Sequence, residues 1–204
     1  MKKPHLPGLA LIVILALPPV RTGLEAAMVG HMLVQLPLLA LGGWWCVRAL
    51  PEPWRARLQA YNGHGLPGIL LVLFGVAFWM LPRSLDAALS APVVEAAKFV
   101  TLPMLVGAPL ALSWPRLHPV AKGFVFANAL SMLGVLGWLY RESPVRLCNF
   151  YLIDQQTLAG NGLLILAGAL LASWIVRVLV GPLPRFTCRV RWASRPHRRF
   201  PPSL

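Results

Sequence analysis

The sequence predicts an all-α protein, a polytopic transmembrane helical bundle of about six spans with both termini cytoplasmic. Of its 204 residues 57% are hydrophobic and only 12% are charged, and the mean hydropathy is +0.67. Soluble domains carry about 25% charged residues, so this composition is typical of a membrane protein. The apolar residues also gather into runs close to the roughly 20 residues that a spanning helix needs.

The chain divides into a transmembrane bundle over residues 1–182 and a basic cytoplasmic tail over residues 183–204. Short polar connections separate the apolar runs, which sets the limits of each predicted helix. The predicted spans cover residues 6–20, 26–47, 65–82, 97–115, 120–140 and 157–180.

The first segment has two interpretations. Its apolar run from Leu6 to Val20 is short and ends near Pro18-Pro19, and Lys2 and Lys3 precede it. These features fit either a spanning helix or a secretory signal region, although no small-residue cleavage pattern follows Arg21. Both interpretations place the start of the second segment outside the cell.

The basic residues predict the orientation. Most of the 19 Lys and Arg fall in one alternating set of connections and in the tail, whereas the acids, apart from Glu52, fall in the other set. Because Lys and Arg are retained on the cytoplasmic side, the basic set is expected to be cytoplasmic and the neutral set to face the periplasm or the cell exterior.

The tail is expected to bind membrane lipids. Its position just beyond the last span makes anionic headgroups the nearest partner, at about 1 kcal/mol per basic residue. A solvated tail that only fixes the topology is the alternative, and no motif supports binding to nucleic acid. The expected lipid-binding residues are Arg189, Arg191, Arg195, Arg198 and Arg199.

The second segment carries the strongest candidate site. Met28, His31, Met32 and Gln35 are spaced i, i+3, i+4 and i+7, so they share one face of a helix. A polar residue left in lipid costs a few kcal/mol, and we therefore expect His31 to face protein or a cavity.

Imidazole and thioethers together suit copper, because soft sulfur selects Cu(I). The predicted metal ligands are His31, Met32 and Met28, with Met80 from the outer end of the third segment. The alternative is structural, since methionine often fills irregular cores and an intramembrane histidine often only bonds to a neighbouring helix.

The last outer loop and the start of the sixth segment form a second candidate region. Asp154 is placed to cap the helix, or to orient His31 or attract a cation at the outer mouth, with Gln156 and Gln35 as further polar residues there. Cys148 is the only cysteine expected outside, so an intrachain disulfide is not expected. A metal ligand, an intermolecular thiol and a simple loop residue all fit it.

Other polar residues have structural interpretations. Glu95 and Lys98 are spaced i, i+3 and are expected to form an interfacial ion pair. Asn128 and Ser131 in the fifth segment, with Asn161 in the sixth, are expected to form hydrogen bonds between helices. No connected motif supplies an activated nucleophile or an acid–base pair, so the protein is not expected to be an enzyme.

Two segments resemble the cytochrome c oxidase assembly factor CtaG family of bacterial membrane proteins. One is the run from Met28 through His31, Met32 and Gln35 to Gly42, and the other begins Asp154-Gln155-Gln156 and ends at Gly160. The family usually has a second histidine where this chain has Gln35. The resemblance implies a location in the bacterial inner membrane and copper delivery to the oxidase, with roles for His31, Met32, Asp154 and Gln156.

The leading expectation is therefore an assembly factor for a respiratory terminal oxidase that binds or delivers copper near the periplasmic face, with oxidase subunits as partners. A structural or interaction subunit of a membrane complex, without metal, is the alternative. A small ion or metal transporter is a third, although no internal repeat supports it. The sequence leaves the oligomeric state open.

Overall fold

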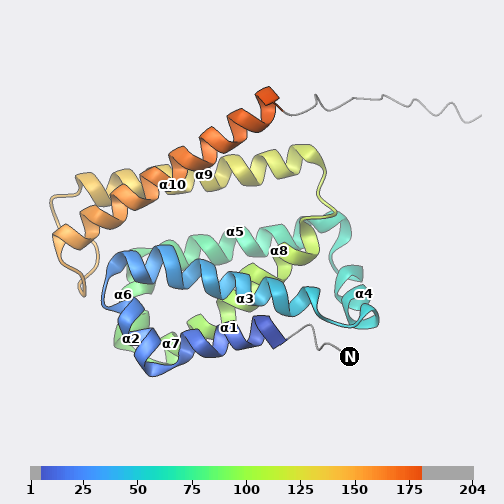
Figure 1. The fold of residues 1–204 in the computed structure, drawn as a ribbon, viewed down its shortest axis with the longest axis horizontal. Helices are drawn as coiled ribbons and strands as arrows, with labels where there is room; N and C mark the ends of the chain where they lie inside the picture. The colour runs from blue at the N-terminus through green and yellow to red at the C-terminus, as the bar shows by residue number, and fades with distance from the viewer. Residues whose placement is uncertain (1–5, 181–204) are drawn as a thin grey trace, which may run out of the picture.

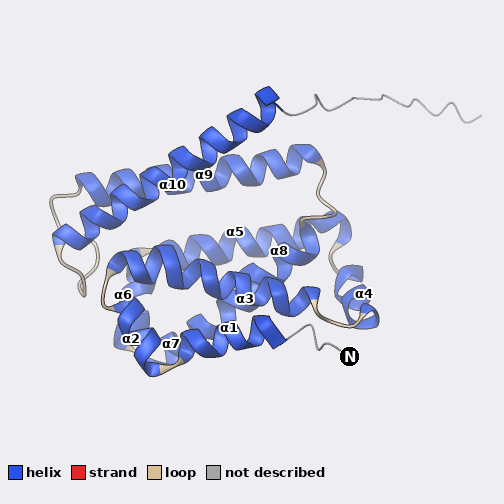
Figure 2. Cartoon of the chain, viewed as in Figure 1, coloured by secondary structure: helices blue, strands red, loops and turns tan. Residues whose placement is uncertain are grey.

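The computed structural model describes residues 6–180, and this part of the chain contains helices and their connections but no strands (Figure 2). The all-helical prediction is thus confirmed. The predicted tail, including Arg189, Arg191, Arg195, Arg198 and Arg199, lies outside the described residues. The elements in order are α1 (Leu6–Ala16), α2 (Pro18–Glu25), η1 (Gly30–Gln35), α3 (Leu36–Arg48), α4 (Glu52–Ala60), η2 (Gly63–Gly65), α5 (Leu66–Met80), α6 (Pro82–Ser90), α7 (Pro92–Thr101), η3 (Leu102–Gly107), α8 (Ala108–Ser113), α9 (Pro119–Glu142) and α10 (Ile153–Val180).

Five helical stretches in the described residues are long and apolar enough to cross a membrane, which indicates a membrane protein. Each overlaps one of the predicted spans, since apolar runs of this length leave little choice of helix limits. The five stretches are Gly30–Arg48, Gly63–Met80, Pro92–Ser113, Pro119–Glu142 and Ile153–Val180.

The expected first span, residues 6–20, is two helices rather than one. Helices α1 and α2 meet at an angle of 70°, and Pro18 and Pro19 open α2. Proline fixes its own φ and disfavours helical geometry in the preceding residue, and Leu17 is extended accordingly. The bend turns α2 toward α7 (Figure 1), and Arg21 and Glu25 of α2 form ion pairs with α7.

Two of the spans contain a wide π-helical turn. In η1 the N–H of Leu36 bonds to the carbonyl of His31, five residues back, and in η3 the N–H of Ala108 bonds to that of Pro103. A proline lies at or beside each turn, Pro37 after η1 and Pro103 within η3, and proline cannot donate the usual helical bond. Such turns are frequent at functional sites.

The helix α3 packs tightly against η3 because glycine allows their backbones to touch. A Cβ added at Gly43 would lie 2.2 Å from the carbonyl oxygen of Pro103, and one at Gly107 would lie 2.0 Å from that of Ala40. Small residues at such crossings are a common device of membrane helices. This contact fixes the distance between the two spans that carry the polar cluster described below.

Helices α9 and α10 pack along each other as a hairpin at one side of the molecule (Figure 1). The hairpin meets the rest of the bundle at the end where α10 begins, near η1. Residues of α5 and α9 also line a cavity of about 580 Å³. This hollow is called the α5–α9 groove below.

Candidate functional site

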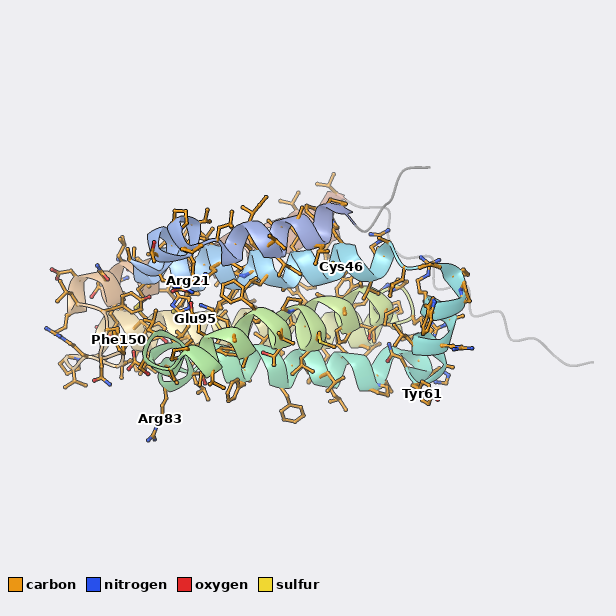
Figure 3. The ribbon with its side chains drawn as sticks, turned by 90° about the horizontal axis from the view of Figure 1, so that it is seen from below. Arg21, Cys46, Tyr61, Arg83, Glu95 and Phe150 are labelled. Carbon is orange, nitrogen blue, oxygen red and sulfur yellow. The ribbon has the colours of Figure 1, made fainter. Side chains whose placement is uncertain are left out.

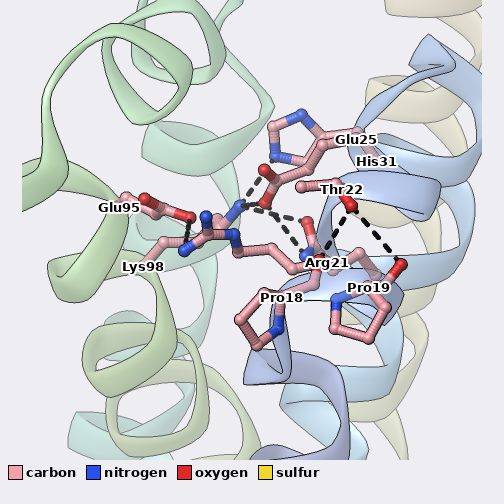
Figure 4. Close-up of polar contacts among 9 residues, drawn as sticks. Pro18, Pro19, Arg21, Thr22, Glu25, His31, Glu95 and Lys98 are labelled. Carbon is pink, nitrogen blue, oxygen red and sulfur yellow. Dashed lines mark hydrogen bonds and ion pairs between the residues drawn. The ribbon is translucent and has the colours of Figure 1, made fainter.

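The most polar part of the described interior is a cluster where α2, η1 and α7 meet (Figure 4). It contains Glu25 from the end of α2, His31 and Gln35 from η1, and Lys98 from α7. His31, Gln35 and Lys98 are fully buried, and the side chain of Glu25 is 11% exposed. The cluster therefore holds an ionic pair that is almost completely removed from water.

The ammonium group of Lys98 lies at the centre of this cluster. Its Nζ is 2.6 Å from Oε1 of Glu25, 3.0 Å from Oε1 of Gln35 and 3.1 Å from Nε2 of His31. An ammonium group has three protons to donate, and these three acceptors use all of them. The amide of Gln35 also donates to Oε1 of Glu25, at 3.1 Å.

These contacts assign the protonation of His31. The Lys98 ammonium can only donate, so Nε2 of His31 accepts and the ring proton lies on Nδ1. Nδ1 is 3.0 Å from the hydroxyl of Tyr151, which in turn donates to the backbone carbonyl of Glu25 at 2.9 Å. His31 is thus a neutral imidazole that links the ion pair to the loop before α10.

A second ion pair lies beside the first. Arg21 Nη1 is 2.8 Å from Oε1 of Glu95, so α2 and α7 are joined by two pairs of opposite polarity. The prediction that Glu95 and Lys98 pair with each other is wrong. Both face α2, where Arg21 pairs with Glu95 and Glu25 pairs with Lys98.

The predicted methionine ligands lie at different places. Met28 and Met32 are buried in the core with His31, as expected for one inward face. Met80 is half-buried and lines the α5–α9 groove.

The polar residues of the second candidate region have other partners than expected. Asp154 is exposed in the first turn of α10, and the hydrogen-bond partner of His31 is Tyr151. Gln156 is buried and holds the α9–α10 connection: its Oε1 accepts from the N–H of Leu147 at 2.8 Å, and its Nε2 donates to the carbonyl of Tyr140 at 3.2 Å. Gln156 therefore positions the loop that carries Tyr151.

That loop also buries Cys148, which is 1% exposed and a free thiol. Burial, and then the nearby charge of Asp86, raise the pKa of Cys148 to about 12. Burial and the charge of Glu25 likewise raise the pKa of Tyr151 above its usual value. Both groups are therefore neutral at physiological pH, which suits a packed loop residue rather than a reactive thiol.

Comparisons with family models, curated proteins and solved structures find no match to this chain. The candidate site consequently rests on its own geometry.

That geometry does not fit a bound copper ion. Nε2 of His31 faces the Lys98 ammonium and Nδ1 carries the proton shared with Tyr151, so neither nitrogen presents a lone pair. A cationic group within hydrogen-bond distance of the proposed ligand also repels a metal cation. Within residues 6–180, no group of three or more His, Cys, Asp and Glu residues is placed to hold a metal ion.

Sequence analysis missed Arg21, Glu25 and Tyr151. The available signal was the spacing of opposite charges: Arg21 and Glu25 are i, i+4, and Glu95 and Lys98 are i, i+3. Such spacings permit an ion pair within each helix, but they equally permit two ion pairs between the helices. Nothing in the local sequence distinguishes these arrangements, and nothing marks Tyr151.

Proposed function

We propose that this protein is a non-catalytic assembly factor of the bacterial inner membrane, which holds a transmembrane helix of a partner protein in the α5–α9 groove. The observation that carries the proposal is the exposure of Asn128 and Ser131 in that groove. They lie near the middle of α9, a helix of 24 residues. Within the described residues, neither side chain makes the interhelical hydrogen bond that the sequence predicted.

The other lining residues are apolar, so contact with an apolar helix is more favourable in the groove than contact with water. Leu70, Phe74 and Ala77 of α5 face Val135 and Leu136 of α9 across the hollow. An amide and a hydroxyl at mid-span gain from hydrogen bonds to another helix, which lipid chains cannot supply.

The polar cluster supports the same proposal because it stabilises the helices beside which the α9–α10 hairpin, and with it one wall of the groove, is held. The two ion pairs hold α2 to α7, and the contact of His31 with Tyr151 holds the entry of α10 to η1. The hairpin is thus anchored at one end.

The resemblance to the CtaG family names the class of partner, a subunit of a respiratory terminal oxidase. Its two segments meet in space, because η1 contacts α10 and His31 contacts the loop just before it. The second candidate function, copper handling, is favoured by the burial of Met28 and Met32 beside His31 and is opposed by Lys98.

Co-purification from cells that express the oxidase tests the proposal. The variant Asn128→Leu/Ser131→Ala keeps an apolar surface but removes both polar groups, so we expect it to lose most of the co-purified subunit. Ser173→Ala on exposed α10, where the hydroxyl bonds only within its own helix, is the matched control and should retain the subunit. Equal recovery with all three proteins would contradict the proposal.

Copper titration separates the second candidate from the first. With His31 held by Lys98, wild type and His31→Ala should bind Cu(I) with the same affinity. A clear loss of affinity in His31→Ala would establish copper handling.

A further inference from the structure

Tyr61, at the end of the bundle opposite Arg21 and Glu95 beside the polar cluster (Figure 3), lines one of two adjoining hollows beside the short helix α4. One has a volume of about 500 Å³ and the other of about 250 Å³, and Val47 and Leu112 line both. The two differ sharply in chemistry. The larger is lined almost wholly by apolar groups, whereas the smaller adds the charged and amide side chains of Arg48, Glu52, Arg55 and Gln59 to its apolar lining.

The larger hollow has the shape and lining of a slot for an acyl chain. It runs along the η3–α8 span from Leu112 to Met104, which is about 12 Å of helix axis. Leu71 of α5 and Ile12 of α1 complete its walls. The one polar side chain that is buried there, Asn62, is already bonded to Ser113 and to the N–H of Gly68. The slot therefore offers a ligand almost only apolar contact.

The smaller hollow adjoins the slot at Val47 and Leu112 and carries basic side chains. Arg48, Arg55 and Gln59 line it, and Glu52 is its one acid, in contact with Arg55. Arg116 bonds to the side chain and the carbonyl of Gln59, which holds α4 against the end of α8. The arrangement leaves a net positive charge beside the mouth of the apolar slot.

Aromatic residues place this region at a membrane surface. Trp54 and Tyr61 are strongly exposed on and after α4, a helix with no buried residue. The guanidinium groups of Arg48 and Arg57 lie over the rings of Trp44 and Trp54, at 5.7 and 5.4 Å. Tryptophan, tyrosine and arginine together are typical of the headgroup level of a bilayer.

We propose that these two hollows form one binding site for an anionic phospholipid, with an acyl chain in the apolar slot and the phosphate beside Arg48 and Arg55. Charge complementarity selects the anionic headgroup, and the slot selects a lipid over a free phosphate. The site is independent of the α5–α9 groove and of the polar cluster.

Native mass spectrometry of the full-length protein in detergent tests the site. We expect phosphatidylglycerol to bind more tightly than phosphatidylcholine with the same chains, and glycerol phosphate, which has no chains, not to bind detectably. Arg48→Gln/Arg55→Gln should weaken phosphatidylglycerol binding roughly 30-fold and leave phosphatidylcholine binding unchanged.

Two further variants test the slot itself and the effect of removing arginines elsewhere on the protein. Met104 is 64% exposed, so Met104→Trp should fold and partly fill the slot, weakening the binding of both lipids. Arg83→Gln/Arg146→Gln removes two exposed arginines elsewhere and should bind both lipids as wild type does. Circular dichroism confirms that each variant folds. Equal binding of the two lipids by wild type, equal loss in the two arginine pairs, or tight binding of glycerol phosphate would each overturn the proposal.

Discussion

Replacing Lys98 with methionine removes the charge at the centre of the polar cluster while keeping a side chain of similar length. Lys98 is fully buried and donates to Glu25, His31 and Gln35. In Lys98→Met the carboxylate of Glu25, only 11% exposed, loses its counter-ion, and two further buried acceptors lose their donor.

The expected loss of stability follows from this burial. Removing one partner of a buried ion pair costs about 3–5 kcal/mol, because the other charge stays buried and unpaired. For a chain of this size, that loss lowers the melting temperature by about 6–20 °C. Arg21→Gln is the matched comparison. The Arg21 side chain is 33% exposed, so loss of its pair with Glu95 should cost at most about 1 kcal/mol.

Thermal unfolding in detergent, followed by circular dichroism, measures both losses. The double variant Glu25→Gln/Lys98→Met removes both charges and should be more stable than Lys98→Met alone, which gives a coupling energy of about 0.5–3 kcal/mol. If Lys98→Met melted like Arg21→Gln, or if the double variant showed no coupling, the buried ion pair of Glu25 and Lys98 would not stabilise the fold as described above.

Three further predictions concern packing, the loop before α10 and its thiol. Gly107→Ala should destabilise the protein by about 1–3 kcal/mol through overpacking. Gly134→Ala is the control and should be neutral or stabilising, because a Cβ added there meets nothing within 4 Å. Similar melting temperatures for the two variants would contradict the close contact of α3 with η3. Gln156→Leu leaves buried backbone groups unpaired, so it should lower the free energy of unfolding by about 1–3 kcal/mol. Asp154→Asn, at an exposed position, should lower it by less than about 0.5 kcal/mol, and thermal unfolding measures both. Cys148 should resist maleimide at pH 7 in the folded protein and react once it is unfolded, with mass spectrometry locating the label. Because its pKa is raised to about 12, the neutral thiol favours the folded state at lower pH, and this stabilisation is lost as the pH rises from the ordinary thiol value toward 12. Rapid labelling of the folded protein at pH 7 would refute the burial.

The sequence was sufficient for the helical class and for the approximate limits of five helical stretches long and apolar enough to cross a membrane, because long apolar runs have few alternatives to a helix there. It also predicted that Met28, His31, Met32 and Gln35 turn inward, and all four are buried. The bend at Leu17 was not predicted, although Pro18-Pro19 was its visible cause.

The site was less predictable, since its key contacts are tertiary. Lys98 was assigned to Glu95 by local spacing, but the fold brings Glu25, 73 residues away, into contact with it. Tyr151 contacts His31 across 120 residues, which no local pattern encodes. Asp154 was expected near His31 because both were placed at the outer ends of their predicted segments, yet Asp154 is exposed in the first turn of α10.

Photo-crosslinking in living cells tests the proposed helix-holding function most directly. A photoreactive amino acid at position 131, inside the α5–α9 groove, should crosslink to a transmembrane segment of an oxidase subunit. The same amino acid at position 165, where Ile165 is 72% exposed on α10, should give little of that product. Equal crosslinking at both positions, or none at position 131 in cells that assemble the oxidase, would contradict the account.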